Sequence, residues 1–184
     1  MDLDKIVNLQ DHPLVESKSF IQSCNDRLAK ESVLQLNNFL NDQALLELQE
    51  EARKLHEKAY YCSQFHTILL NKKDPKAPVD DPCNIEVKSD KGCVPHDLIP
   101  PHSFLNRLYS SIKFQNFLTK ILGVKNIYPY KDNLSSINYN YYEKGQQLGW
   151  HFDNASFAIT LMIDSPDKGG VFQYITKGRD YQKN

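Results

Sequence analysis

Residues 142–153 read Tyr-Glu-Lys-Gly-Gln-Gln-Leu-Gly-Trp-His-Phe-Asp, and the expectations for the rest of the chain start from this segment. His151 and Asp153 are separated by one residue, so on an extended backbone their side chains leave the same face. A neutral imidazole and a carboxylate are two of the three ligands in a 2-His-1-carboxylate iron site. The segment therefore predicts a metal site with His151 and Asp153 as ligands.

The motifs around this pair make it specific, because a His-x-Asp match alone is weak in a chain with 6 histidines. A turn glycine, Gly145, precedes the pair. An apolar run rich in β-formers follows at residues 157–163, and Gly169-Gly170 leads into a second such run at residues 171–175. The expected order is turn, metal pair, strand, turn and strand.

This order resembles the iron- and 2-oxoglutarate-dependent oxygenases, in which Tyr-x-x-Gly, His-x-Asp, an apolar strand and Gly-Gly-x-aromatic follow one another. Residues 134–138, 149–154, 157–163 and 169–174 look like the branch that hydroxylates or halogenates free amino acids and similar small metabolites. The resemblance implies an α+β protein with a double-stranded β-helix core of the jelly-roll or cupin-like kind. It also implies Fe(II), 2-oxoglutarate and O2 as cofactors and co-substrates, and a small-molecule substrate, an amino acid above all.

The resemblance implies a reaction as well. In the family, 2-oxoglutarate chelates the iron, and its decarboxylation to succinate and CO2 drives oxidation of an unactivated C–H bond of the substrate. Halogenating relatives replace the carboxylate ligand by a small residue, so that chloride can bind the iron. The carboxylate of Asp153 therefore favours a hydroxylase over a halogenase.

Further site residues are expected on either side of the metal pair. A strand predicted at residues 135–142 places Asn138, Asn140 and Tyr142 on one polar face. The resemblance gives this strand contacts to 2-oxoglutarate or substrate, while an outer face exposed to water fits the alternation equally well. Arg179 is the candidate for the cation that meets the distal carboxylate of 2-oxoglutarate.

The chain departs from the family pattern, because no histidine follows His151 to complete the triad. The residues after Asp153 hold about two strands, where a jelly roll has about eight, so the β-helix is expected to be incomplete. We favour a chain that is a fragment of a longer enzyme. Alternatively, His66, His96 or His102 completes the site, a partner chain supplies the ligand, or the protein is a non-catalytic remnant.

Two other functions stay open beside the hydroxylase. One is a non-catalytic or truncated cupin-like binding module. The other is a prolyl-hydroxylase-like enzyme acting on a protein, because the Tyr-x-x-Gly to His-x-Asp spacing fits that branch too. In either case a half-built sheet would end at residues 171–175 with an unpaired edge, and we expect poor solubility or a homo-oligomer.

The predicted organisation has two parts, a helical and strand-containing N-terminal region at residues 1–125 and the first half of the β-helix at residues 126–184. Hydrophobic spacing predicts helices at residues 14–30, after a cap at Asn41 or Asp42, and at residues 103–122, and a strand at residues 60–70. Six prolines between residues 71 and 102 predict one long loop, read as a substrate lid or a disordered segment.

Composition narrows the partners and the compartment. Lys+Arg number 22 against 23 Asp+Glu with no block of like charge, which argues against nucleic acid or an anionic membrane as partner. The acidic N-terminus lacks the basic and apolar regions of a signal peptide, and no apolar run approaches the ~18 residues of a membrane span. We expect a cytoplasmic protein whose four cysteines are free thiols.

Overall fold

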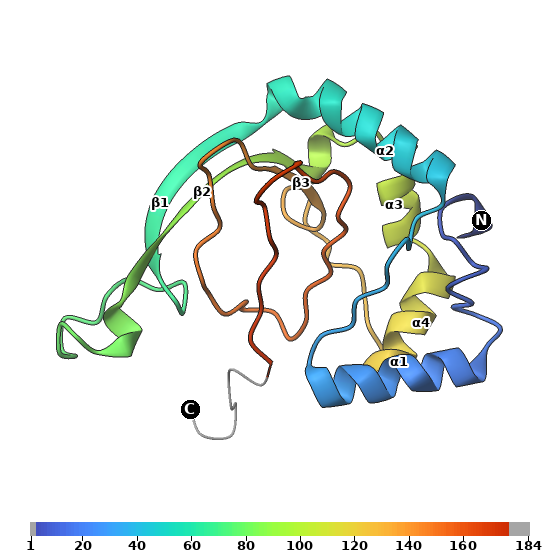
Figure 1. Ribbon diagram of the computed structural model, residues 1–184, viewed down its shortest axis with the longest axis horizontal. Helices are drawn as coiled ribbons and strands as arrows, with labels where there is room; N and C mark the ends of the chain where they lie inside the picture. Colours follow the sequence, from blue (N-terminus) through green and yellow to red (C-terminus); the bar gives the residue numbers. More distant parts are fainter. Residues whose placement is uncertain (1–2, 177–184) are drawn as a thin grey trace.

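The computed structural model describes residues 3–176 and is a mixed α and β arrangement with one small antiparallel sheet. The helices are α1 (Lys18–Glu31), α2 (Asp42–Leu55), α3 (Phe104–Tyr109) and α4 (Ile112–Leu122), and the strands are β1 (Tyr60–Thr67), β2 (Glu86–Pro95) and β3 (Asn138–Tyr141). Short 3-10 turns are η1 (Leu3–Lys5), η2 (His56–Lys58), η3 (Pro82–Asn84) and η4 (His96–Leu98). Figure 1 shows a long hairpin, β1 and β2, that curves away from a helical body.

The predicted helices form, with one change. The Asn41 side chain caps α2 by accepting a hydrogen bond from the Ala44 N–H at 2.8 Å. The helix predicted at residues 103–122 is two helices, because Ser111 interrupts it and caps α4 with its hydroxyl. Gly123 ends α4 with a positive φ of 65°, the left-handed conformation that glycine adopts most readily.

The sheet has the strand order β1-β2-β3, so β2 is its middle strand. One face packs on α2, where Tyr139 donates a hydrogen bond to the Glu51 carboxylate and Tyr141 donates one to the Ala52 carbonyl, each at 2.7 Å. The opposite face carries His66, Ser89, Asn138 and Asn140, as the pairing register and the alternation of strand side chains require. The sheet therefore combines strands from both parts of the chain.

The prediction of one long loop at residues 71–102 is wrong, because β2 occupies the centre of this range. Five of the six prolines that suggested a loop lie outside this strand and the sixth, Pro95, is its last residue, so the run from 83 to 94 contains none. Within that run, residues 86–93 alternate and pair with β1, from Tyr60 opposite Cys93 to Thr67 opposite Glu86. Proline disrupts a middle strand when it falls in the strand interior, and Pro95 lies at the end of the ladder, opposite Asn138.

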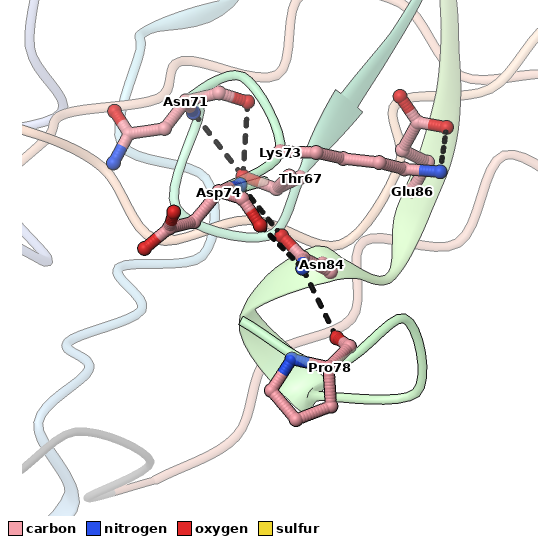
Figure 2. Close-up of polar contacts among 7 residues, drawn as sticks. All are labelled: Thr67, Asn71, Lys73, Asp74, Pro78, Asn84 and Glu86. Carbon is pink, nitrogen blue, oxygen red and sulfur yellow. Dashed lines mark hydrogen bonds and ion pairs between the residues drawn. The ribbon is translucent and has the colours of Figure 1, made fainter. Parts of the chain in front are cut away.

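What remains of the predicted loop is the connection at residues 68–85, which forms the tip of the hairpin. Its chain is held by side-chain hydrogen bonds, as Figure 2 shows: Asn84 donates to the carbonyls of Asp74 and Pro78, at 3.0 and 3.1 Å. Lys73 and Glu86 form an ion pair of 2.8 Å across its base. The tip is an ordered turn that projects from the body, and whether it acts as a lid stays a prediction (Figure 1).

The region after β3 is extended but makes little regular structure. The strands predicted at residues 157–163 and 171–175 have no strand partner within residues 3–176, so neither is a β-strand there. Gly169 and Gly170 do form the predicted turn, with φ of 81° and 61°. The double-stranded β-helix therefore stays a prediction. No helix within the described part of the chain is long and apolar enough to cross a membrane.

The core under α2 provides a direct test of the packing. Leu48 is 1 % exposed, whereas Leu46 on the same helix is 61 % exposed. We expect Leu48→Ala to lower the free energy of unfolding by about 2–5 kcal/mol, because it leaves a cavity in the core. Leu46→Ala, the matched control, is expected to change it by less than about 0.5 kcal/mol. Urea denaturation followed by circular dichroism measures both, and equal effects would contradict the placement of α2.

Candidate functional site

The segment that carries His151 runs alongside the β1–β2 hairpin. After β3 the chain makes a turn in which Gly145 has a φ of 85°, and it then returns to the edge of β2. The Asp90 N–H donates to the Gln147 carbonyl at 2.7 Å, and the Phe152 N–H donates to the Ile68 carbonyl at 2.8 Å. These two hydrogen bonds fix both ends of residues 147–152 against the hairpin.

Gly149 allows this close approach. A Cβ atom at this position would lie 2.7 Å from the Lys88 carbonyl oxygen and 2.8 Å from a methyl group of Val87. The buried Gly149 N–H donates instead to the Ser89 hydroxyl at 2.9 Å. The glycine therefore has a packing role, because only a residue without a side chain fits against the backbone of β2.

The structure brings the two predicted metal ligands together. His151 Nε2 lies 3.3 Å from Asp153 Oδ1, and His151 Nδ1 lies 2.7 Å from the Gly149 carbonyl oxygen. A carbonyl only accepts hydrogen bonds, so Nδ1 carries the proton and, in the neutral ring, the lone pair is on Nε2. That is the tautomer a metal-binding histidine needs when its other nitrogen is held by the backbone.

This geometry fits two neighbouring positions around one metal ion. Two bonds of about 2.1 Å at a right angle place their donor atoms about 3 Å apart, close to the 3.3 Å between Nε2 and Oδ1. The His151 side chain is 20 % exposed and the Asp153 side chain 55 %, so the site opens to one side. Within residues 3–176, no group of three or more His, Cys, Asp or Glu side chains is arranged to hold a metal ion.

The three histidines considered as a third ligand, His66, His96 and His102, lie at different places. The His66 ring is next to the His151 ring, edge to face, with 6.1 Å between centroids. Its Nδ1 lies 2.9 Å from the Thr67 carbonyl oxygen and its Nε2 2.6 Å from the Ser89 hydroxyl, so both nitrogens are engaged. His96 is held by the side chains of Ser136 and Asn106, and His102 is exposed before α3.

The predicted 2-oxoglutarate residues are farther from this site. Asn138 and Asn140 share the sheet face of His66, and Asn140 donates to the Asn138 amide oxygen at 2.7 Å. Asn140 lies opposite Cys93, four residues along β2 from Ser89, which corresponds to about 13 Å at the usual rise of a strand. Tyr142 is 48 % exposed, and its pKa is raised mainly by burial of the hydroxyl. Arg179 lies outside the described residues.

Two residues at the site were missed by the sequence analysis. Ser89 was assigned to a loop, although the alternation in residues 85–94 is the signal that would have placed it on a strand. Gly149 was quoted only as part of the motif, and nothing in the sequence shows what it approaches.

On the other face of β2, the ammonium group of Lys88, 2.8 Å from Asp90, holds the pKa of that carboxyl below its usual range.

A separate cavity of about 540 Å³ opens between His96, Arg107 and Asn133. It lies at the far end of β2, seven residues from Ser89, or about 23 Å along the strand. This cavity is therefore too far from His151 and Asp153 to position a substrate there.

Comparison with models of known protein families gives a match. The model of a protein family described as HalD, halogenase D, matches residues 85–184, which is more than half of the chain. The matched region begins just before β2 and contains Ser89, Gly149, His151 and Asp153. Searches of curated proteins and of solved structures give no significant match.

The contact at Gly149 is testable by amide hydrogen exchange. Gly149→Ala is expected to push residues 147–152 away from β2, because the new methyl group meets backbone atoms. Exchange at the Asp90 and Phe152 amides should then become faster. Gly92→Ala is the matched control on β2, since its methyl group meets no backbone but the ring of Tyr61, a 37 % exposed side chain that can move at the cost of its hydrogen bond to His56. Unchanged exchange in Gly149→Ala would refute the contact.

Proposed function

Because this chain belongs to the halogenase D family, we propose that it is an Fe(II)- and 2-oxoglutarate-dependent oxygenase whose iron is bound by His151 and Asp153. Bound iron and 2-oxoglutarate would supply the oxidising power, with succinate and CO2 as co-products. The substrate we propose is an amino acid or another small molecule, hydroxylated at an unactivated C–H bond.

One observation supports this proposal above the others, namely the placement of His151 and Asp153. Their donor atoms lie 3.3 Å apart, and the proton of His151 is on the nitrogen that faces the Gly149 carbonyl. The imidazole nitrogen and the carboxylate oxygen thus lie side by side before any metal arrives, which lowers the ordering cost of binding. The family match includes both residues.

The carboxylate is the reason to propose hydroxylation for a member of a family named after a halogenase. An iron ion bound by Asp153 would have one coordination position fewer for a halide than an iron ion without a carboxylate ligand. A carboxylate 3.3 Å from His151 Nε2 occupies the position that a halide would need. With Asp153 as a ligand, chloride would have no position on the iron, so the substrate C–H bond would be hydroxylated with an oxygen atom from O2 rather than chlorinated.

The chain's own residues would perform three tasks. His151 and Asp153 bind the metal, and the Gly149 carbonyl holds the imidazole in the required tautomer. The Asp153 side chain, 55 % exposed, lies at the open side of the site, where substrate and 2-oxoglutarate would enter. The cation for the distal carboxylate of 2-oxoglutarate is assigned to Arg179 as part of the same proposal.

Anaerobic titration with Fe(II) in the presence of 2-oxoglutarate tests the site. The expected result is the visible metal-to-ligand charge-transfer band of the ternary complex in the wild-type chain, and its loss in His151→Ala and in Asp153→Ala. His56→Ala, a histidine that contacts Tyr61 and Tyr141 near the start of β1, is the control and should retain the band. A folded wild-type chain without the band would overturn the proposal and favour the cupin-like binding module.

The reaction type is tested separately by product analysis. The wild-type chain is supplied with Fe(II), 2-oxoglutarate, O2, chloride and a mixture of the twenty amino acids, and the products are examined by mass spectrometry. We expect a product that gains one oxygen atom, formed together with succinate. A product in which chlorine replaces hydrogen would show that Asp153 does not exclude the halide, and a modified protein substrate in place of an amino acid would favour the prolyl-hydroxylase-like alternative.

A further inference from the structure

The hydrogen bonds of His151 belong to a longer chain that begins on β1. His66 Nε2 lies 2.6 Å from the Ser89 hydroxyl, and the same hydroxyl accepts a hydrogen bond from the Gly149 N–H at 2.9 Å. The Gly149 carbonyl in turn accepts from His151 Nδ1 at 2.7 Å. Four residues from three separate segments are thus linked in one series.

Every proton in this series has a determined place. The Thr67 carbonyl only accepts, so His66 carries its proton on Nδ1 and has a lone pair on Nε2. The Ser89 hydroxyl then donates to His66, and its oxygen remains free to accept the Gly149 N–H. The Gly149 carbonyl accepts a hydrogen bond from His151 Nδ1, which in the neutral ring leaves the Nε2 lone pair on the side of Asp153.

We propose that His66 and Ser89 are positioning residues that fix the orientation and the tautomer of His151. His66 fixes the direction of the Ser89 hydroxyl, and Ser89 anchors the Gly149 backbone that receives the His151 proton. The part of this inference that concerns metal affinity rests on the proposed function, whereas the part that concerns the tautomer does not.

Burial gives these contacts their weight. Ser89 is 4 % exposed and Gly149 is buried, so loss of the hydroxyl would leave the Gly149 N–H without a partner inside the protein. The edge-to-face contact between the His66 and His151 rings adds a second constraint, because it limits rotation of the His151 side chain. His66 therefore acts on His151 both through the ring contact and through Ser89.

The same contacts distinguish positioning from direct metal binding by His66. A third ligand would need the Nε2 lone pair that accepts the Ser89 hydroxyl, since Nδ1 is engaged by Thr67. A glutamine at position 66 offers an amide oxygen that can accept the same hydrogen bond, but it is a poor iron ligand. His66→Gln should therefore preserve a positioning role and abolish a ligand role.

The first experiment uses the metal-free chain. Nitrogen-15 NMR of the histidine side chains reports which ring nitrogen carries the proton, and we expect the neutral ring of His151 to be protonated on Nδ1. In Ser89→Ala and His66→Phe, this fixed tautomer should give way to a mixture, while His66→Gln should retain it. Two matched controls should also retain it: His56→Phe, which removes another ring that bonds a hydroxyl, and Ser111→Ala, which removes another buried serine that accepts a backbone N–H.

The second experiment measures the affinity for Fe(II) without substrate. Loss of an orienting partner typically weakens metal binding by about 10- to 100-fold. We expect Ser89→Ala and His66→Phe to show a loss in this range, and His66→Gln and both controls to stay close to wild type. Because the two residues act in one series, the double variant should lose no more than the larger single loss.

The outcomes separate this inference from the proposed function. A wild-type chain in which the neutral ring of His151 carries its proton on Nε2 overturns the inference without any variant, and so does a fixed tautomer that persists in Ser89→Ala and His66→Phe. If Ser89→Ala and His66→Phe both lose the fixed tautomer but the wild-type chain binds no Fe(II), the positioning role is supported and the proposed metal site is overturned. Equal loss of Fe(II) affinity in His66→Gln and His66→Phe overturns positioning and identifies His66 as a ligand.

Discussion

The close approach of Gly149 to β2 is the constraint on which the candidate site depends. Backbone without a side chain lies here against the Lys88 carbonyl and the Val87 side chain, and the buried N–H finds its partner in Ser89. Because His151 follows two residues later, the position of its ring is set by this contact. The site is therefore organised by a strand that lies about sixty residues earlier in the sequence.

The sequence was most informative where a local pattern has a single structural meaning. The cap at Asn41 and the turn at Gly145 were both predicted, because each depends on a residue type and its immediate neighbours. The convergence of His151 and Asp153 was predicted for the same reason. A spacing of two on an extended backbone is a local property, and it did not require knowledge of the fold.

Prediction failed where the deciding contact was distant in sequence. The prolines within residues 71–102 were counted together, so the strand that ends at Pro95 was overlooked. The strands expected at residues 157–163 and 171–175 have suitable side chains, but a strand also needs a neighbour to bond with, and none is present within residues 3–176. Ser89 and His66 could not be connected to His151 from the sequence, because only the pairing of β1 with β2 brings them together.

The β1–β2 register has a consequence for where this chain can tolerate a change in length. Strand side chains alternate with a period of two, so one residue inserted within β1 or β2 would turn His66 or Ser89 to the face that packs on α2. The same insertion in the hairpin tip at residues 68–85 would leave the pairing unaltered. The tip can therefore change in length without disturbing the site, whereas the distance in sequence from His66 to the end of β1, and from Ser89 to the start of β2, cannot.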